Sequence, residues 1–197
     1  MPHDRHGAKQ PNRFDVARAG MLDDAARFAY VPPERIVGLL AVSGAATIVD
    51  FGTGTGTYAI ELAQRLPAAT VFALDEQPEM LARLRAKPEA ASLRNLHAMS
   101  PEELANETGR VDRIFALNVL HELGDEALAS FTTLLAPGGS ALVVDWNADV
   151  ARPIGPPNDH VYGIAAARAR LAAAGLASDI LEDFPYHHAF RARRREG

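Results

Sequence analysis

From Thr47 onwards the sequence alternates short apolar runs with segments whose apolar residues recur every three to four positions. A short apolar run predicts a buried strand, and the longer spacing predicts an amphipathic helix. Such alternation favours parallel strands with helices on both faces of the sheet. The predicted strands are 47–51, 70–74, 95–99, 111–120, 140–146, 178–184 and 187–193, and the predicted helices are 57–66, 77–87, 101–107, 125–135 and 162–175.

The last two predicted strands follow one another without an intervening helix. Two strands joined by a short connection form an antiparallel hairpin, whereas parallel neighbours need a long crossover. We therefore expect one antiparallel strand at the edge of an otherwise parallel sheet. The fold class predicted from these patterns is α/β, a doubly wound sheet of the Rossmann-like kind.

A length of 197 residues fits a single domain. Residues 1–12 are polar and aperiodic, and we expect them to be a disordered tail, so that the folded domain spans 13–197. Residues 13–42 carry a helical pattern that Pro32 and Pro33 interrupt, and Pro33 suits the first turn of a new helix.

Composition excludes several classes of protein. The chain has no cysteine, which rules out disulfides, thiolate metal sites and cysteine catalysis. No apolar run approaches about 18 residues and no signal peptide opens the chain, so a cytoplasmic protein without membrane contact is expected. The net charge of −5 gives no overall attraction to nucleic acid, and we expect no nucleic-acid partner.

The first predicted strand leads into a glycine loop with an acid at its mouth. Gly52 comes two residues after Asp50, and Gly54 and Gly56 follow it, so glycine occupies every second position. Dinucleotide sites favour the spacing G-x-G-x-x-G, which brings a pyrophosphate to a helix N-terminus. Asp50 would repel a pyrophosphate and attract a cation. S-adenosylmethionine carries an ammonium and a sulfonium and no phosphate, and is therefore the cofactor predicted here.

A second acid, Asp75, ends the next predicted strand, 19 residues after Gly56. A carboxylate at this place can accept hydrogen bonds from both ribose hydroxyls of a nucleoside. Asp75 also suits the N-terminus of the following helix, as a capping residue. We favour the nucleoside role because the acid and the glycine loop occur together in one strand–helix–strand unit.

These segments resemble the class I S-adenosylmethionine-dependent methyltransferases, over most of the chain. The resemblance is to the branch that includes ubiquinone and menaquinone C-methyltransferases, of methyltransferase type 11. It implies a seven-stranded sheet in the order 3-2-1-4-5-7-6 with strand 7 antiparallel, and N-terminal helices that cap the site. The segments that carry it are "VDFGTGTG", "LDEQPEML", "MSPEEL", "VDRIFALNVLHEL" and "LAPGGSALVVDW".

The resemblance also implies which residues bind the cofactor. The family often has an acid after the third strand, where this chain has Ser100, with Glu102 and Glu103 beyond it, so the group that reaches the adenine amine is left open. The predicted cofactor-binding residues are Asp50, Phe51, Gly52, Thr53, Gly54, Gly56, Asp75, Glu76, Met80, Ser100, Pro101 and Asn118.

Methyl transfer is an in-line displacement that mainly requires positioning and exclusion of water. A general base helps when the acceptor must lose a proton, and histidine suits neutral pH. His121, His160 and His187 stand at predicted strand ends or in late loops and are the candidate bases. Glu122 follows His121, and we expect its negative charge to stabilise the N-terminus of the following helix rather than to act in catalysis.

The function predicted from the sequence is methyl transfer from S-adenosylmethionine to a small-molecule acceptor. The alternative is a non-catalytic regulatory protein that binds S-adenosylmethionine. We expect no metal, because the histidines show no ligand spacing. Neither the acceptor nor an oligomeric state follows from the residues.

Overall fold

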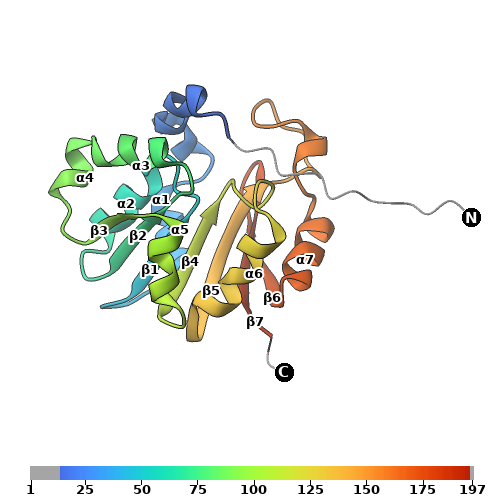
Figure 1. The fold of residues 1–197 in the computed structure, drawn as a ribbon. Coiled ribbons are helices and arrows are strands. Elements are labelled where there is room, and N and C mark those ends of the chain that lie inside the picture. The colour runs from blue at the N-terminus through green and yellow to red at the C-terminus, as the bar shows by residue number, and fades with distance from the viewer. Residues whose placement is uncertain (1–13, 196–197) are drawn as a thin grey trace, which may run out of the picture.

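The computed structural model describes residues 14–195. Seven strands form one sheet in the order β3-β2-β1-β4-β5-β7-β6, with β7 antiparallel to both of its neighbours (Figure 1). The family resemblance implied this strand order and the antiparallel β7. The residue patterns alone placed the antiparallel strand at the edge of the sheet, whereas β7 lies between β5 and β6, one strand in from the edge. The strands are β1 Thr47–Phe51, β2 Thr70–Leu74, β3 Leu96–Met99, β4 Val111–Leu117, β5 Leu135–Trp146, β6 Leu176–Asp183 and β7 His187–Arg194.

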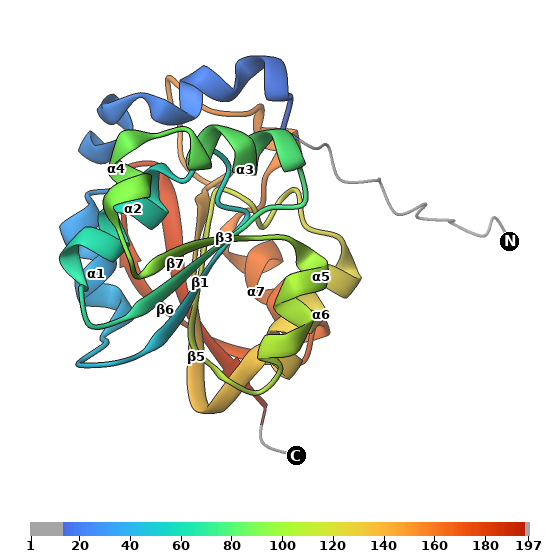
Figure 2. The same cartoon turned by 60° about the vertical axis from the view of Figure 1, so that its left-hand side comes forward.

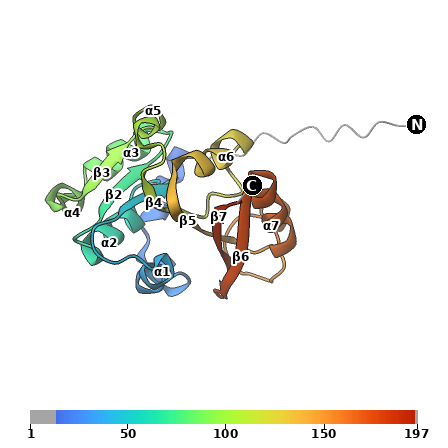
Figure 3. The same ribbon diagram turned by 90° about the horizontal axis from the view of Figure 1, so that it is seen from below.

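Helices cover both faces of the sheet, because its central strands are apolar on both sides. Ile48 packs in one core cluster and its neighbour Val49 in the other. Figure 3 shows α1 and α2 on one face and α5 and α6 on the other. The α-helices are α1 Pro33–Leu40, α2 Thr57–Arg65, α3 Pro78–Arg85, α4 Pro88–Ser92, α5 Pro101–Leu104, α6 Asp125–Leu134 and α7 Ile164–Ala173.

The N-terminal segment forms two 3-10 helices, η1 Val16–Asp23 and η2 Ala25–Ala29, and then α1. Asp15 and Asp24 each accept a hydrogen bond from the backbone two residues later, so each caps a short new helix instead of continuing an old one. The predicted break at Pro32 and Pro33 is present. Residues 1–13, including the tail expected to be disordered, lie outside the described residues.

The second half of the sheet differs from the prediction at one point. Leu135 was assigned to the end of a helix and residues 136–139 to a turn, but β5 begins directly at Leu135. Leu135 pairs with Val111, and the register then shifts before Arg113 pairs with Ser140. Gly138, with a φ of 78°, provides the irregular backbone that this shift requires.

The two N-terminal 3-10 helices lie across the carboxyl edge of the parallel strands, above α3 (Figure 2). The long segment 147–160 reaches the same end of the molecule and contains only the short η4 Asn158–His160. The loops that follow β1, β2 and β4 thus lie at the end of the molecule where η1 and η2 form an N-terminal cap.

Between residues 14 and 195, no helix is long and apolar enough to span a bilayer.

Candidate functional site

A cavity of about 660 Å³ opens at the carboxyl ends of β1, β2 and β4. β1 lies between β2 and β4, so the strand order reverses direction at this point. In an open α/β sheet, such a reversal separates the following loops and leaves a crevice that binds ligands. The volume lies in the range of about 300–1,000 Å³ that is typical of small-molecule sites.

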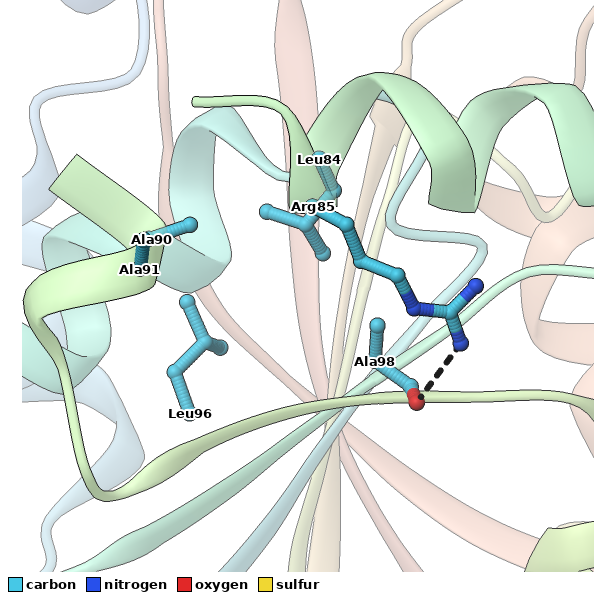
Figure 4. A pocket seen from close by; sticks show the side chains of 6 residues that line it. All are labelled: Leu84, Arg85, Ala90, Ala91, Leu96 and Ala98. Atoms are coloured by element: carbon cyan, nitrogen blue, oxygen red, sulfur yellow. Dashed lines mark hydrogen bonds between the residues drawn. The ribbon is translucent and has the colours of Figure 1, made fainter. Parts of the chain in front are cut away.

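A second, much smaller hollow of about 140 Å³ lies between β3 and the turn from α3 to α4 (Figure 4). Figure 4 shows Arg85 donating a hydrogen bond to the carbonyl oxygen of Ala98 across it. Its walls are otherwise apolar and it shares no lining residue with the large cavity. It is too small for a nucleoside, so the large cavity is the candidate site.

The glycine loop forms the floor of this cavity. Gly52, Gly54 and Gly56 all have positive φ values, between 57° and 77°, which other residues rarely adopt. A Cβ atom on Gly52 would lie 2.6 Å from Val119, and one on Gly54 would lie 2.7 Å from Leu22. The loop is therefore glycine-rich because its backbone packs closely against the segment that follows β4 and against the N-terminal cap.

Asp50 is buried at the mouth of the loop, where the Thr53 hydroxyl donates a 2.6 Å hydrogen bond to its Oδ2 atom. Burial raises the pKa of Asp50 to about 7, and the charge of Asp75 adds to the increase. The Thr53 hydrogen bond and the charge of Arg27 act in the opposite direction. An arriving cation would favour the ionised carboxylate further.

Asp75 is held by the backbone on both sides. Its Oδ2 atom accepts a 2.8 Å hydrogen bond from the Gly54 N–H, and its Oδ1 atom accepts one of 2.9 Å from the Gln77 N–H. Burial raises the pKa of Asp75, although both hydrogen bonds oppose this. A carboxylate oxygen can accept more than one hydrogen bond, so Asp75 is oriented and still able to bind a ligand.

Two polar side chains follow β4. Asn118 adopts a left-handed backbone conformation with φ 57°, which is uncommon for a residue other than glycine. Its Oδ1 atom is buried and accepts no hydrogen bond from the described residues. Glu122 lines the same cavity, and its Oε2 atom accepts a 3.2 Å hydrogen bond from the Phe14 N–H.

The N-terminal cap is tied to the cavity at several points. The Gln77 side chain donates to the Phe14 carbonyl oxygen, so the Phe14 backbone bridges residues that follow β2 and β4. Asp23 accepts hydrogen bonds from the Thr55 hydroxyl at 2.6 Å and from Lys87 at 2.6 Å. Phe14, Leu22 and Arg27 all line the cavity. The cap therefore forms a wall of the site.

The structure brings most of the predicted cofactor residues together. Gly56 and Ser100 are not among the residues that line the cavity: Gly56 precedes α2 and packs against Leu84, and Ser100 caps α5 together with Glu103. The predicted residues that do line it are Asp50, Phe51, Gly52, Thr53, Gly54, Asp75, Glu76, Met80, Pro101 and Asn118.

The three candidate histidines do not gather at the cavity. His121 Nδ1 lies 2.9 Å from Asp145 Oδ1, on the side away from Glu122. His160 is exposed in η4. His187 is buried with its ring against Trp146, 4.1 Å between centroids, and burial lowers its pKa to about 3. Across residues 14–195 no cluster of three or more potential metal ligands occurs.

Sequence reasoning missed Glu122, Arg27 and the side of α6 that faces the cavity. Glu122 was assigned to a helix N-terminus, but α6 begins only at Asp125. Its place shortly after an apolar strand was the available signal, similar to the one that marked Asp50 near the end of β1 and Asp75 directly after β2. Arg27 gave no signal, because it enters the site from a segment far away in the sequence.

The strand order, with its antiparallel β7, is that of the class I S-adenosylmethionine-dependent methyltransferase fold. Residues 48–139 match a protein family described as a methyltransferase domain. Among solved structures, a SAM dependent methyltransferase from Aquifex aeolicus superposes with a TM-score of 0.82 and 27% identity, covering 91% of this chain and 98% of that one. The chain is thus similar to S-adenosylmethionine-dependent methyltransferases in both fold and sequence, and the matched methyltransferase domain covers just under half of it.

Two curated relatives are similar over part of the chain. A demethylmenaquinone methyltransferase from Thermus thermophilus is 33% identical over 116 residues, which are 57% of this chain and 52% of that protein. A trans-aconitate 2-methyltransferase from Deinococcus radiodurans is 38% identical over 96 residues, 48% of this chain and 35% of that protein. The match thus spans about half of the first relative and about a third of the second.

Proposed function

We propose that this protein transfers a methyl group from S-adenosylmethionine to a small-molecule acceptor that carries no negative charge. The observation that supports this most strongly is the charge of the cavity wall. Five of its lining residues are acids and only Arg27 is a cation; the acids are Asp50, Asp75, Glu76, Glu122 and Glu126. Such a wall attracts the ammonium and sulfonium of the cofactor and repels phosphates and polycarboxylates.

The placement of the lining residues supports a set of cofactor roles. We assign hydrogen bonds to the cofactor ammonium to Asp50 and hydrogen bonds to the ribose hydroxyls to Asp75, since both carboxylates line the cavity. The glycine loop lets the backbone approach the chain between them. Met80 and Pro101 line the cavity beyond Asp75 and would pack against the adenine. These assignments follow the sequence prediction and need the test given below.

Methyl transfer needs an aligned acceptor and a site closed to water. The N-terminal cap supports both needs, because Phe14 and Leu22 form part of the cavity wall. The curated relatives are named for two different acceptors, a demethylmenaquinone and trans-aconitate. The acidic wall favours an acceptor without carboxylates for this chain, and so an uncharged, cyclic or quinol-type molecule over a tricarboxylate.

Calorimetry of the full chain with S-adenosylmethionine, S-adenosylhomocysteine and NAD tests the cofactor. We expect binding of the first two and none of NAD; binding of NAD alone would overturn the proposal. Incubation with methyl-labelled S-adenosylmethionine and a panel of acceptors then tests transfer. Cofactor binding without transfer to any acceptor would favour the regulatory alternative.

A further inference from the structure

We propose that Glu122 is a catalytic base that takes the proton which the acceptor loses on methylation. The inference rests on the proposed function and narrows it, because it requires an acceptor whose nucleophilic atom carries a proton. A hydroxyl, an acidic carbon or a primary or secondary amine meets this condition. A thioether or a tertiary amine does not.

The position of Glu122 carries the first step of the argument. Its backbone N–H donates a 2.8 Å hydrogen bond to the carbonyl oxygen of Val119, so Glu122 lies one turn beyond the residue that packs against Gly52. Its side chain lines the cavity together with Asn118 and is four-fifths buried, with 20% of it exposed. Glu122 is therefore a mostly buried carboxylate in the cavity wall, in the segment that follows β4, whereas Asp75 follows β2.

The surroundings of Glu122 carry the second step. The Phe14 N–H donates to its Oε2 atom, while its Oε1 atom lies 3.6 Å from His121 Nε2. The other ring nitrogen of His121, Nδ1, faces the buried carboxylate of Asp145. Asp145 also accepts a 3.0 Å hydrogen bond from the backbone N–H of His121. Glu122 is thus oriented by the cap and backed by an imidazole that a buried carboxylate holds in place.

The charge of the cavity carries the third step. A hydroxyl or an acidic carbon that has already lost its proton is an anion, and the acidic wall disfavours its entry. Such a nucleophile must therefore enter protonated and lose the proton within the site, whereas an amine enters neutral and loses its proton as it is methylated. Among the acids that line the cavity, Asp50, Asp75 and Glu76 have proposed cofactor roles. Of the other two, Glu126 is exposed, so Glu122 is the acid within the site that has no cofactor role.

The proposed step is balanced. For a hydroxyl or an amine, a lone pair of the acceptor atom forms the bond to the methyl carbon; for an acidic carbon, the electron pair of its C–H bond does so, released as Glu122 takes the proton. The carbon–sulfur bond breaks at the same time, and sulfur keeps the bonding electrons as the neutral thioether of S-adenosylhomocysteine. The proton of the acceptor atom passes to a carboxylate oxygen of Glu122 and then leaves to solvent. No oxidant, reductant or metal is consumed.

The proton affinity of Glu122 agrees with this role. Burial raises the pKa of Glu122 to about 7, and the charges of Asp145 and Asp75 add to the increase. His121 and the Phe14 N–H act in the opposite direction. Arg152 is the further charge that faces His121. A base with a pKa near the working pH transfers protons most efficiently.

The test compares Glu122→Gln with the wild-type chain. Glutamine keeps the shape and can still accept the Phe14 hydrogen bond, but it is not a base. We expect turnover of phenol, β-diketone and primary amine acceptors to fall about 100-fold or more, while S-adenosylhomocysteine affinity changes less than about threefold. The wild-type rate should rise with pH through about 7 and the variant should lack this inflection.

Asp125→Asn is the matched control. It removes a carboxylate three residues further along, but its side chain is 90% exposed and pairs with Arg170 outside the cavity. Turnover should match the wild type. Full activity of Glu122→Gln, an unchanged pH inflection, or a preference for dialkyl sulfides over phenols would each overturn the inference without touching the proposed function.

A measurement that needs no acceptor completes the test. In the S-adenosylhomocysteine complex, carbon-13 labelled glutamate carboxyls can be titrated by NMR, with Glu122→Gln identifying the signal. A midpoint near neutral pH supports the inference. A midpoint at the ordinary glutamate value, about 4.3, would overturn it. Failure of S-adenosylhomocysteine to bind at all would instead count against the proposed function.

Discussion

Both halves of the sheet end in polar residues, but only the first half presents them to a cavity. Asp50 near the end of β1, Asp75 after β2 and Asn118 after β4 line the cavity. Near the end of β5, Asp145 binds His121, and at the start of β7, His187 packs against Trp146. The polar groups of the first half therefore face a ligand site, and those of the second half are held by other side chains of the protein.

The difference follows from topology. Between β1 and β4 the strand order reverses, so the following loops diverge and leave a crevice. Between β5 and β7 the chains are antiparallel neighbours, and Trp146 pairs directly with His187. A polar residue at a strand end is thus evidence for a site only where the neighbouring connections separate.

The largest effect on ligand affinity is expected from a side chain that fills the floor of the cavity, in the first half of the sheet. Gly54→Val would place side-chain atoms against Leu22, which a Cβ atom alone approaches to 2.7 Å. We expect S-adenosylhomocysteine affinity to fall about 100-fold, equal to about 3 kcal/mol of binding free energy. The positive φ should also cost about 1–2 kcal/mol of folding free energy. Calorimetry and thermal unfolding measure the two effects separately, and unchanged affinity would show that the loop is not the cofactor floor.

Asp75→Asn should weaken the same ligand by a smaller amount. The amide keeps the size of the side chain and can accept a hydrogen bond from the Gly54 N–H, but it lacks the charge that strengthens bonds to ribose hydroxyls. We expect a loss of about 1–3 kcal/mol of binding free energy. Adenosine, which has the same ribose, should be weakened to a similar extent. A loss confined to S-adenosylhomocysteine would place Asp75 elsewhere along the cofactor.

The pH dependence of binding tests Asp50. In the free protein its pKa is raised to about 7, so below that pH the carboxyl is largely protonated. A cationic ligand requires the ionised form, so S-adenosylhomocysteine affinity should rise with pH, by up to about tenfold per unit, and level off above 7. Adenosine lacks the ammonium and serves as the control. Equal pH dependence of the two ligands would remove Asp50 from the ammonium site.

The smallest effect on activity is expected from a substitution in the second half of the sheet. His187→Phe replaces a buried ring whose two nitrogens lack hydrogen-bond partners within residues 14–195, so turnover should stay near that of the wild type. The folded pKa of His187 is lowered to about 3, so its neutral form stabilises the fold fully above about 6.5, and this contribution is lost as the pH falls towards 3. Unfolding in urea between pH 4 and 7 should show a shallower pH slope for the variant. Loss of turnover at neutral pH would contradict the comparison of the two halves.

The residue patterns were enough to predict the succession of strands and helices and the closing hairpin, because apolar alternation and helical spacing are local properties of the chain. The order of the strands in the sheet came from the family resemblance. Asp50, Gly52, Gly54 and Asp75 were recognisable because they lie within one strand–helix–strand unit of about 30 residues. These residues approach one another in space because the strands that carry them, β1 and β2, are neighbours in the sheet.

The tertiary structure decided which of the remaining polar residues meet at the cavity. Glu122 and the histidines all occupy places that the sequence pattern treats alike, yet Glu122 lines the cavity while His121 turns to Asp145 and His187 to Trp146. Arg27 and Phe14 reach the site only because the N-terminal segment folds back across the carboxyl edge of the sheet. Side-chain direction and long-range closure depend on packing between distant segments, and no local pattern in the sequence records that packing.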